Sequence, residues 1–474
     1  MTRRLFLKAS ASAALWTAAG PGCTDALRTD RHPYQPLSSD QKLILTGAQA
    51  ALDKTLYPAL RQRAYPGHFT VTVDGRSYGE ENTWPGLDSW EMAGAYLLAG
   101  RQREVLDYFD FVQASQRQDG NIPFAIFPGD KSPGSLDSWL RGLRFPQDVY
   151  SYKPAVRPGQ PAYSNLNSRK WIGLFTHWQV KVNPLSVLGA ASYILTASDI
   201  QAQMKSKAWL AEKLPSLEAA GNYLRSRISS NGLMAGAGFY VESPPRNQWD
   251  GVTQCYGIYC FRRLAELNRL LGKRAASSNW ARHADTLSSP FHEIFWKQDH
   301  FAEYVHPEHG VIDSHGLSDV NWAAIGLGVA TGNHIKVLWP LLKNEPAFWR
   351  GNMPTHLVTR PGSYEKWEYA EPLPFAYNSW TQDVAAMGRV WYLEALACVR
   401  MRDHRRLRQS VINVCQMGKK SDWLWHERYH AGEGDTVHPA GTSGYCEYPA
   451  ILIRVLLGNP GVFPEAKRLR KQSS

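Results

Sequence analysis

The chain has 474 residues, of which 43% are hydrophobic and 12% aromatic, so it can build a large buried core and is not intrinsically disordered over most of its length. Its net charge of +11 is concentrated at the two ends: three cations lie within residues 1–23, four lie after residue 466, and neither segment contains an acid. The body between them carries only +4 and shows no zinc-finger spacing or basic stripe, which argues against a nucleic-acid partner.

Residues 1–23 have the pattern of an export signal. Arg3 and Arg4 precede an apolar stretch with small residues, and Gly-Pro-Gly then leads to Cys23. This pattern is typical of twin-arginine export, so we expect a periplasmic or extracellular protein, anchored to a membrane only if Cys23 is lipidated. No other apolar run is long enough to span a bilayer. The five later cysteines match no metal-site spacing and are expected to be buried thiols with at most one disulfide.

Helical periodicity dominates the chain after a Pro-rich linker at residues 24–38. A capped helix is predicted over 38–63, and residues 68–79 predict a small β-hairpin because Asp-Gly joins two β-rich flanks. Further helices are predicted near 88–100, 101–118, 177–198, 206–229, 252–272, 274–296, 317–331, 334–343, 379–400, 404–418 and 442–457.

The connections between these helices alternate between short polar turns and long loops rich in aromatic residues, Gly, Pro and acids. Twelve helices with such connections predict an all-α fold, an (α/α)6 barrel over residues 39–460 followed by a basic tail at 461–474. An open α-solenoid is the alternative, and it is less favoured because no period of 34 to 47 residues repeats.

Residues 83–124 contain the first specific motif. Leu-Asp-Ser-Trp, with Asp88 and Trp90, opens a predicted helix, and Gln-x-x-Asp-Gly-x-Ile-Pro follows at residues 116–123. Together they resemble the start of six-hairpin glycosidases, in particular clan members that act on α-glucosides, mannosylglycerate and related sugars. The resemblance implies an (α/α)6 barrel that hydrolyses a glycosidic bond. Asp88 is then either a helix cap or a sugar contact, while Asp119-Gly120 also fits an ordinary turn.

The loop before the predicted helix at 252–272 contains the candidate general acid. Relatives commonly read Glu-Ser-Gly-x-Asp here, with the Asp as acid; this chain keeps Glu242-Ser243, but two prolines follow and the next acid is Asp250. A poorly hydrated neighbour such as Trp249 raises the pKa of a carboxyl and keeps it protonated. We therefore predict Asp250 as the acid, with Glu242 as the alternative acid and helix capping as the alternative role of Asp250.

The loop before the last predicted helix, "HERYHAGEG", contains the candidate general base. It resembles the Glu-x-Tyr pattern that precedes the last inner helix of many six-hairpin glycosidases, and this assigns Glu427 as the base. Glu433 and Glu447 are the alternatives, as a loop acid and a helix-cap acid. His426 and His430 flank Glu427 with His-Glu-x-x-His spacing, a pattern that binds zinc when it lies on a helix. Because the resemblance assigns this loop to one wall of a sugar cleft, the histidines are expected to have supporting roles and no metal is expected.

The resemblance also implies a set of sugar contacts. Asn321 and Trp322 are expected to face the cleft from the start of an inner helix, unless Ser318 and Asp319 merely cap that helix. The full set of substrate-binding candidates is Asp88, Trp90, Trp249, Gln254, Asn321, Trp322 and Tyr429.

The expected chemistry needs two carboxylates on opposite sides of the scissile bond: a protonated one for the leaving oxygen and an ionised one that activates water. A separation of roughly 6.5–9.5 Å inverts the anomeric configuration, and relatives in this clan invert. A polysaccharide lyase, with Tyr429 or His177 as base, is the enzyme alternative; a carbohydrate-binding relative that has lost one carboxylate is the other. We expect an oligosaccharide or polysaccharide partner, no cofactor, and a monomer or small homo-oligomer.

Overall fold

The computed structural model describes residues 37–61, 67–73, 83–129, 149–153, 173–178, 184–236, 244–370, 381–432 and 436–472. The described chain is mostly helical, with four small sheets. The predicted export signal and Cys23 lie outside it, so these expectations remain predictions.

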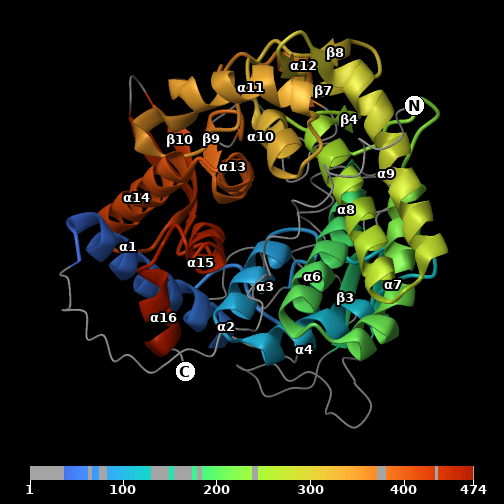
Figure 1. Ribbon diagram of the computed structural model, residues 1–474, viewed down its shortest axis with the longest axis horizontal. Helices are drawn as coiled ribbons and strands as arrows, with labels where there is room; N and C mark the ends of the chain where they lie inside the picture. Colours follow the sequence, from blue (N-terminus) through green and yellow to red (C-terminus); the bar gives the residue numbers. More distant parts are fainter. Residues whose placement is uncertain are drawn as a thin grey trace, which may run out of the picture.

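Six helices surround the centre of the molecule (Figure 1). Each contacts the next in chain order, and the last contacts the first, so the contacts run in a closed circle. These inner helices are apolar on most faces because neighbouring helices cover them on all sides. In α15 (Glu447–Gly458), for example, nearly every residue is buried. The six inner helices are α3 (Ser89–Leu98), α6 (Leu188–Met204), α8 (Gly251–Leu270), α10 (Asp319–Gly326), α13 (Gly388–Met401) and α15 (Glu447–Gly458).

A second set of helices lies outside the first and packs against it (Figure 1). These helices are amphipathic; α14, for example, buries Leu407, Val411 and Val414 and turns its charged residues outward. The outer set is α1 (Ser39–Ala50) continued by η1 (Ala51–Leu56) and α2 (Tyr57–Arg61), then α4 (Gln102–Gln113), α7 (Lys207–Arg225), α9 (Arg274–Phe295), α11 (Gly332–Asn344) and α14 (His404–Lys420). All twelve predicted helices therefore have a counterpart, in an arrangement compatible with an α/α toroid.

Three of the predicted helices begin too early. Strands or a short 3-10 turn occupy the first part of the predicted ranges 177–198, 379–400 and 442–457, because the backbone there pairs with neighbouring strands. These segments are β3 (Gly173–Trp178) and η2 (Pro184–Val187) before α6, β9 (Ala385–Met387) before α13, and β11 (Val437–Ser443) before α15.

The strands form four small antiparallel sheets in the described chain, ordered β1-β3-β2, β4-β7-β8, β5-β6 and β11-β10-β9. All of them lie in connections that lead into an inner helix, whereas the connections out of the inner helices are short. The remaining strands are β1 (Ala125–Gly129), β2 (Val149–Lys153), β4 (Trp249–Asp250), β5 (Trp296–Lys297), β6 (His300–Phe301), β7 (Tyr304–His306), β8 (Gly310–Ile312) and β10 (His426–Ala431).

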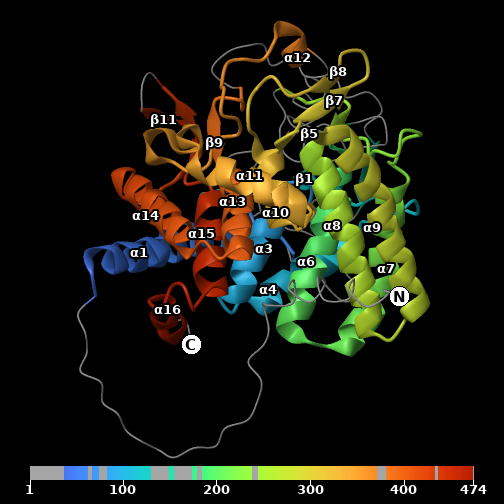
Figure 2. The same cartoon turned by 45° about the horizontal axis from the view of Figure 1, so that its top comes forward.

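The long connections gather at the end of the molecule where the inner helices begin. In Figure 2, β5, β7, β8, β9 and β11 lie together on the upper side of the helices, with the short helix α12 (Lys366–Ala370) above them. This end therefore carries the loops that the sequence predicted to be rich in aromatic residues and acids.

Residues 71–73, in the predicted hairpin, bond to another part of the chain. Val73 donates its backbone N–H to Gly444, and Cys446 donates to Val71. The Asp-Gly turn lies outside the described residues, so the hairpin remains a prediction. At the other end, the segment assigned to a basic tail contains α16 (Ala466–Gln472), which packs against α1 and α15.

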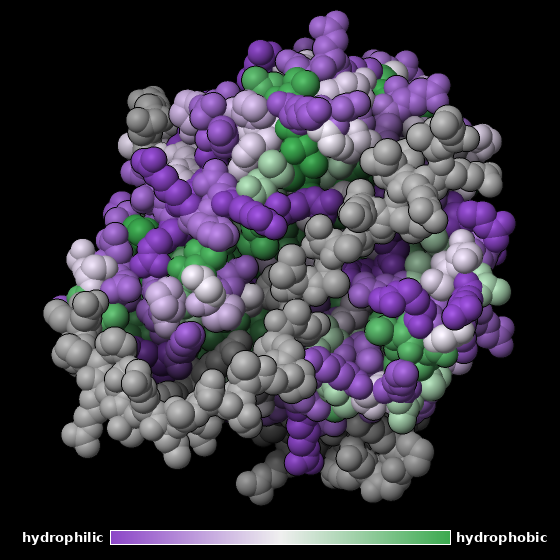
Figure 3. Space-filling view, in the orientation of Figure 1, coloured by the Kyte–Doolittle hydropathy of each residue, from purple (hydrophilic) through white to green (hydrophobic). Residues whose placement is uncertain are grey.

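The face of the molecule in Figure 3 is largely hydrophilic, with scattered apolar patches. Among the described residues, Val337 and Leu341 are the only exposed large hydrophobic side chains. The five cysteines after Cys23 are buried and none forms a disulfide. Within the described part of the chain, no helix combines the length and the apolar character needed to cross a bilayer.

Candidate active site at the amino-terminal end of the inner helices

Two buried groups of charged residues lie where the inner helices begin. We name each after its arginine. The Arg389 cluster consists of Asp88, Glu91, Arg389, Tyr445 and Glu447. The Arg246 cluster consists of Arg246, Asp250, Glu303, Tyr304, His315, Asp319, Tyr364 and Glu368.

The Arg389 cluster joins three inner helices. Nη2 of Arg389, on α13, lies 2.9 Å from Oδ1 of Asp88, and its Nε lies 3.1 Å from Oε1 of Glu447 on α15. The hydroxyl of Tyr445 donates to the other oxygen of Asp88. Asp88 precedes α3 but makes no side-chain cap bond to it. Its carboxylate is therefore held by an arginine and a tyrosine, and the capping alternative is wrong.

Two other carboxyls of the Arg389 cluster hold protons near neutral pH. Burial raises the pKa of Glu91 to about 8, and the negative charge of Asp88 adds to the effect. Burial also raises the pKa of Glu447 to about 7, although Arg389 opposes the shift. Carboxyls whose pKa lies near the working pH are suited to proton transfer, which makes this cluster a candidate for acid-base chemistry.

The Arg246 cluster brings three carboxylates onto one fully buried guanidinium. Nη1 of Arg246 lies 2.8 Å from Oδ1 of Asp319 and 3.2 Å from Oδ1 of Asp250, and Nε lies 2.5 Å from Oε1 of Glu303. Burial raises the pKa of Asp319 to about 7, against the opposing charge of Arg246. One arginine thus ties the starts of α8 and α10 to the segment just before β7.

A histidine supplies the second cation of the Arg246 cluster. Nδ1 of His315 lies 2.5 Å from Oε2 of Glu303, and its Nε2 lies 3.2 Å from Oε2 of Glu368. Burial disfavours the charged imidazolium, but the hydrogen bonds to these two carboxylates outweigh it and raise the pKa of His315 to about 9. The ring of Tyr364 stacks on His315 at a centroid distance of 3.5 Å. His315 is therefore protonated at neutral pH.

Asp250, the predicted general acid, has both carboxylate oxygens engaged. Oδ2 accepts the backbone N–H of Thr253 at 2.7 Å and so caps α8, while Oδ1 accepts from Arg246 at 3.2 Å. Burial raises the pKa of Asp250, and Arg246 works against that shift. These contacts fit the alternative role of Asp250, which is to cap the helix that follows it. Glu242, the alternative acid, lies outside the described residues.

Glu427, the predicted general base, lies on β10, in the connection that leads into α15. Its side chain is 10% exposed, whereas Asp250 is fully buried. Oε2 accepts the backbone N–H of Thr442 at 3.4 Å, and Oε1 lies 3.7 Å from Nε of Arg428. Gly441 has a φ of +69° and no side chain, and an added Cβ would lie 2.3 Å from Oε2 of Glu427. The local backbone therefore leaves room for this carboxylate.

Four of the predicted sugar contacts are fully buried and have a packing role in place of the expected contact with sugar. The amide of Gln254 bonds to both backbone groups of Met234 at 2.8 Å, and the oxygen of the Asn321 amide accepts from Phe301 at 2.8 Å. Trp322 and Tyr429 pack within the hydrophobic core; Trp322 contacts rings of the outer layer, and Tyr429 contacts Tyr448. Because α10 turns Trp322 toward the outer helices, it faces away from the centre.

The two remaining predicted contacts, Trp90 and Trp249, are also anchored by their ring nitrogens. Nε1 of Trp90 donates to Oδ2 of Asp199 at 2.9 Å, and the guanidinium of Arg454 lies 4.9 Å from the Trp90 ring. Nε1 of Trp249 donates to Oγ of Ser229 at 3.1 Å, and this indole is half-buried. Trp249 is therefore the more accessible of the two indoles.

The arginines that organise both clusters were not predicted from the sequence. Arg389 and Glu447 lie in helices whose residues are mostly apolar and buried, and a charged residue in such a helix must be buried and paired. That signal identifies the Arg389 cluster in principle. Arg246 lies in a loop and has no such signal. No group of three or more His, Cys, Asp or Glu among the described residues is placed to hold a metal ion.

No family model matches this sequence, and no curated protein matches it. Solved structures do. They include a GH63 mannosylglycerate hydrolase from Thermus thermophilus in complex with glucose (12% identity, TM-score 0.55, covering 87% of this chain and 99% of that one). A rhamnosidase from Klebsiella oxytoca with rhamnose bound also matches (12% identity, TM-score 0.52, 90% and 65% coverage).

A GH78 family rhamnosidase of Bacillus sp. GL1 matches at 13% identity and a TM-score of 0.51, over 86% of this chain; the chain spans only 34% of that protein. At these identities the likeness shows the fold alone: this chain shares the mostly helical fold of these glycosidases.

Proposed function

We propose that this chain is a glycoside hydrolase whose catalytic carboxylates lie at the amino-terminal end of a closed (α/α)6 barrel. The circular contacts of the six inner helices support the barrel, and the fold shared with a mannosylglycerate hydrolase and two rhamnosidases supports the enzyme class. The predicted export signal adds that the enzyme works outside the cytoplasm.

The position of Glu427 carries this proposal. It is a carboxylate in the connection into the last inner helix, and its side chain is 10% exposed, whereas Asp250 is fully buried. It also occupies the place that the Glu-x-Tyr pattern assigns to a general base. In that role the ionised Glu427 takes a proton from the water that attacks the anomeric carbon.

The acid is assigned to the loop at 242–250, on the opposite side of the scissile bond. It protonates the leaving oxygen, and inversion follows if the two carboxyls stand roughly 6.5–9.5 Å apart. Within this loop, Glu242 competes with Asp250, because each oxygen of Asp250 already accepts a hydrogen bond. The two acids are distinguished by mutation.

Hydrolysis of a panel of oligosaccharides and aryl glycosides, with the product anomer read by NMR, tests the proposal. Glu427→Gln should lower kcat by about 10²–10⁴-fold, because general base catalysis contributes that much, while Glu308→Gln, at an exposed carboxylate in the β7–β8 turn, should hydrolyse like the wild type. A Glu427→Gln variant with full activity would remove the assignment, and a wild type that cleaves nothing would remove the proposal.

The acid is identified by its dependence on the leaving group. Glu242→Gln and Asp250→Asn are compared on a natural disaccharide and on a dinitrophenyl glycoside, whose leaving group needs no protonation. The variant that loses activity on the first substrate and keeps it on the second marks the acid. Products that absorb in the near ultraviolet would instead indicate the lyase alternative.

A carbohydrate-binding protein without hydrolysis is the second candidate, and Arg246 favours it. In the register set by Glu242-Ser243, the fifth position of Glu-Ser-Gly-x-Asp falls on Arg246, so a cation stands where relatives have their acid. Binding of an oligosaccharide by the wild type without any cleavage, measured by calorimetry and product analysis, would support this candidate over the hydrolase.

A further inference from the structure

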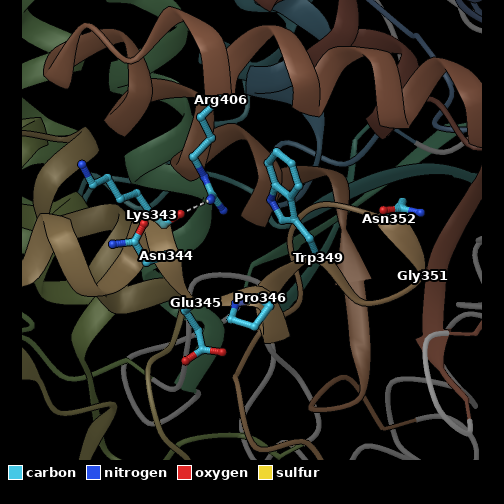
Figure 4. Close-up of a pocket in the computed structure, with 8 residues that line it drawn as sticks. All are labelled: Lys343, Asn344, Glu345, Pro346, Trp349, Gly351, Asn352 and Arg406. Atoms are coloured by element: carbon cyan, nitrogen blue, oxygen red, sulfur yellow. Dashed lines mark hydrogen bonds between the residues drawn. The ribbon is translucent and has the colours of Figure 1, made fainter.

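A pocket of about 320 Å³ lies on the outer layer of helices, and none of its lining residues belongs to either charge cluster (Figure 4). It is formed where α11 ends, where the 3-10 segment η3 (Pro346–Asn352) follows, and where α14 begins. Its volume is at the lower limit of small-molecule sites. The lining residues are Lys343, Asn344, Glu345, Pro346, Trp349, Gly351, Asn352 and Arg406.

The aromatic wall of this pocket is held rigidly. Nε1 of Trp349 lies within hydrogen-bond distance of both carboxylate oxygens of the buried Glu394, at 3.0 and 3.1 Å. Arg406 extends from α14 and lies between Lys343 and Trp349 (Figure 4). Its guanidinium lies 4.4 Å from the centroid of the Trp349 ring, and its Nη1 donates to the carbonyl of Lys343 at 2.7 Å. A wall fixed in this way loses little conformational entropy when a ligand binds.

The pocket lining carries little net charge. Arg406 is paired through Nε with Glu394 at 2.7 Å, and Oε1 of Glu345 accepts the backbone N–H of Ala347 at 2.9 Å. A site built for a phosphate or a carboxylate usually brings several cations together, and a site for a divalent metal needs several oxygen anions. This lining offers the exposed Lys343, the paired Arg406 and one carboxylate, so a neutral ligand fits it better.

The lining instead alternates apolar surfaces with groups that both donate and accept hydrogen bonds. Trp349 and Pro346 supply the apolar surfaces, and the exposed amides of Asn344 and Asn352 supply the donors and acceptors. A neutral sugar has the complementary pattern, with C–H faces that lie against aromatic rings and hydroxyl groups that donate and accept.

We propose that this pocket is a second carbohydrate-binding site, which holds a neutral sugar unit of a glycan on residues separate from both charge clusters. The choice of a sugar rests on the proposed function, whereas the neutrality and the size of the ligand follow from the pocket itself. Such a site would anchor a polymeric substrate on the outside of the protein and leave the hydrolysis of short substrates unaffected.

Affinity electrophoresis toward the cathode tests this proposal, in gels that contain soluble starch, mannan or mixed-linkage β-glucan, with polygalacturonate as the acidic comparison. The test variant is Asn344→Ala combined with Asn352→Gly; glycine keeps the φ of +60° at residue 352 without strain. The control is Asn333→Ala, at an exposed asparagine near the other end of α11.

The wild type and the control should be retarded by at least one neutral polysaccharide. The double variant should bind that polysaccharide about tenfold more weakly, since two hydrogen-bonding amides are lost, and should hydrolyse short substrates at the wild-type rate. Three results would each overturn the proposal. The double variant could be retarded as strongly as the wild type, the wild type could be retarded by no neutral polymer, or the double variant could lose binding only to polygalacturonate. Hydrolysis is measured separately, so a failed pocket and a failed hydrolase assignment give different results.

Discussion

The Arg389 cluster and the Arg246 cluster lie at the same end of the inner helices, but they compensate buried negative charge in different ways. In the Arg389 cluster, one arginine pairs with Asp88 and Glu447, and raised pKa values keep the additional carboxyl, Glu91, protonated. In the Arg246 cluster, two cations hold four carboxylates: Arg246 contacts three of them, and His315 contacts the fourth, Glu368, together with Glu303.

This difference predicts how well each cluster tolerates the loss of a cation. A cluster that relies on protons adapts to the loss of a cation, because its carboxyls already titrate near neutral pH. The Arg246 cluster has less such capacity. Asp319 also has a pKa of about 7, but Arg246 lowers the pKa of Glu303, and Arg246 touches three carboxylates while fully excluded from solvent. We therefore expect the Arg246 cluster to be the more fragile of the two.

Removing Arg246 should have the largest effect on stability. Arg246→Met leaves three buried carboxylates without their shared cation, and breaking a buried pair in this way costs about 3–5 kcal/mol of unfolding free energy. Arg389→Met should cost less, because two carboxylates lose a partner and Glu447 can take up a proton. Urea unfolding of both variants at pH 7 measures the difference. A greater loss in Arg389→Met would reverse the comparison.

His315 should make the stability of the protein depend on pH in the alkaline range. Its pKa is raised to about 9 from an unfolded value of about 6.5, so its contribution is complete below pH 6.5 and is lost as the pH rises to 9. The shift corresponds to about 3 kcal/mol. His315→Gln should therefore be less stable than the wild type at pH 6 and should approach it at pH 9.

Denaturant unfolding at half-unit pH steps measures this convergence, with the exposed His404→Gln as the control. Asp319 and Glu91 have raised pKa values, so they also make the protein less stable as the pH rises, but at lower pH than His315 does. The quantity to compare is therefore the difference in unfolding free energy between variant and wild type at each pH. Parallel curves for His315→Gln and the wild type would show that the imidazole is neutral in the folded protein.

An exposed ion pair supplies the smallest effect and the reference for both clusters. Nζ of Lys54 lies 3.0 Å from Oδ1 of Asp422, but the two side chains are 42% and 85% exposed. Solvent screens such a pair, so Lys54→Met should change the unfolding free energy by about 0.5 kcal/mol or less. If Lys54→Met lost as much unfolding free energy as the cluster variants, burial would not explain why the cluster pairs are costly to break.

The helices could be predicted from the sequence because their signals are local. The apolar periodicity of α8 or α14 and the capping residues at α1 and α7 lie within the helices or next to them. The starts of α6, α13 and α15 were misplaced because β3, β9 and β11 depend on pairing partners elsewhere in the chain. Short strands of this kind carry too little local information.

The candidate site was predictable only in part, for the same reason. The position of Glu427 follows from its place before the last helix, which the order of elements determines. The partners of Asp88 are different: Tyr445 lies 357 residues away in the sequence, so no local pattern links them. The sequence also did not predict that Asn321 and Trp322 are turned into the packing, because the rotation of α10 is determined by its neighbours.

The contact between Asp88 and Tyr445 has a consequence during protein synthesis. Ribosomes add about 5–20 residues per second, so the 357 residues between these two side chains take roughly 20–70 s to make. During that time α3 has emerged without α15, the neighbour that covers its apolar face on one side. The nascent chain therefore leaves this apolar face of α3 without its native partner until the final helix has been made.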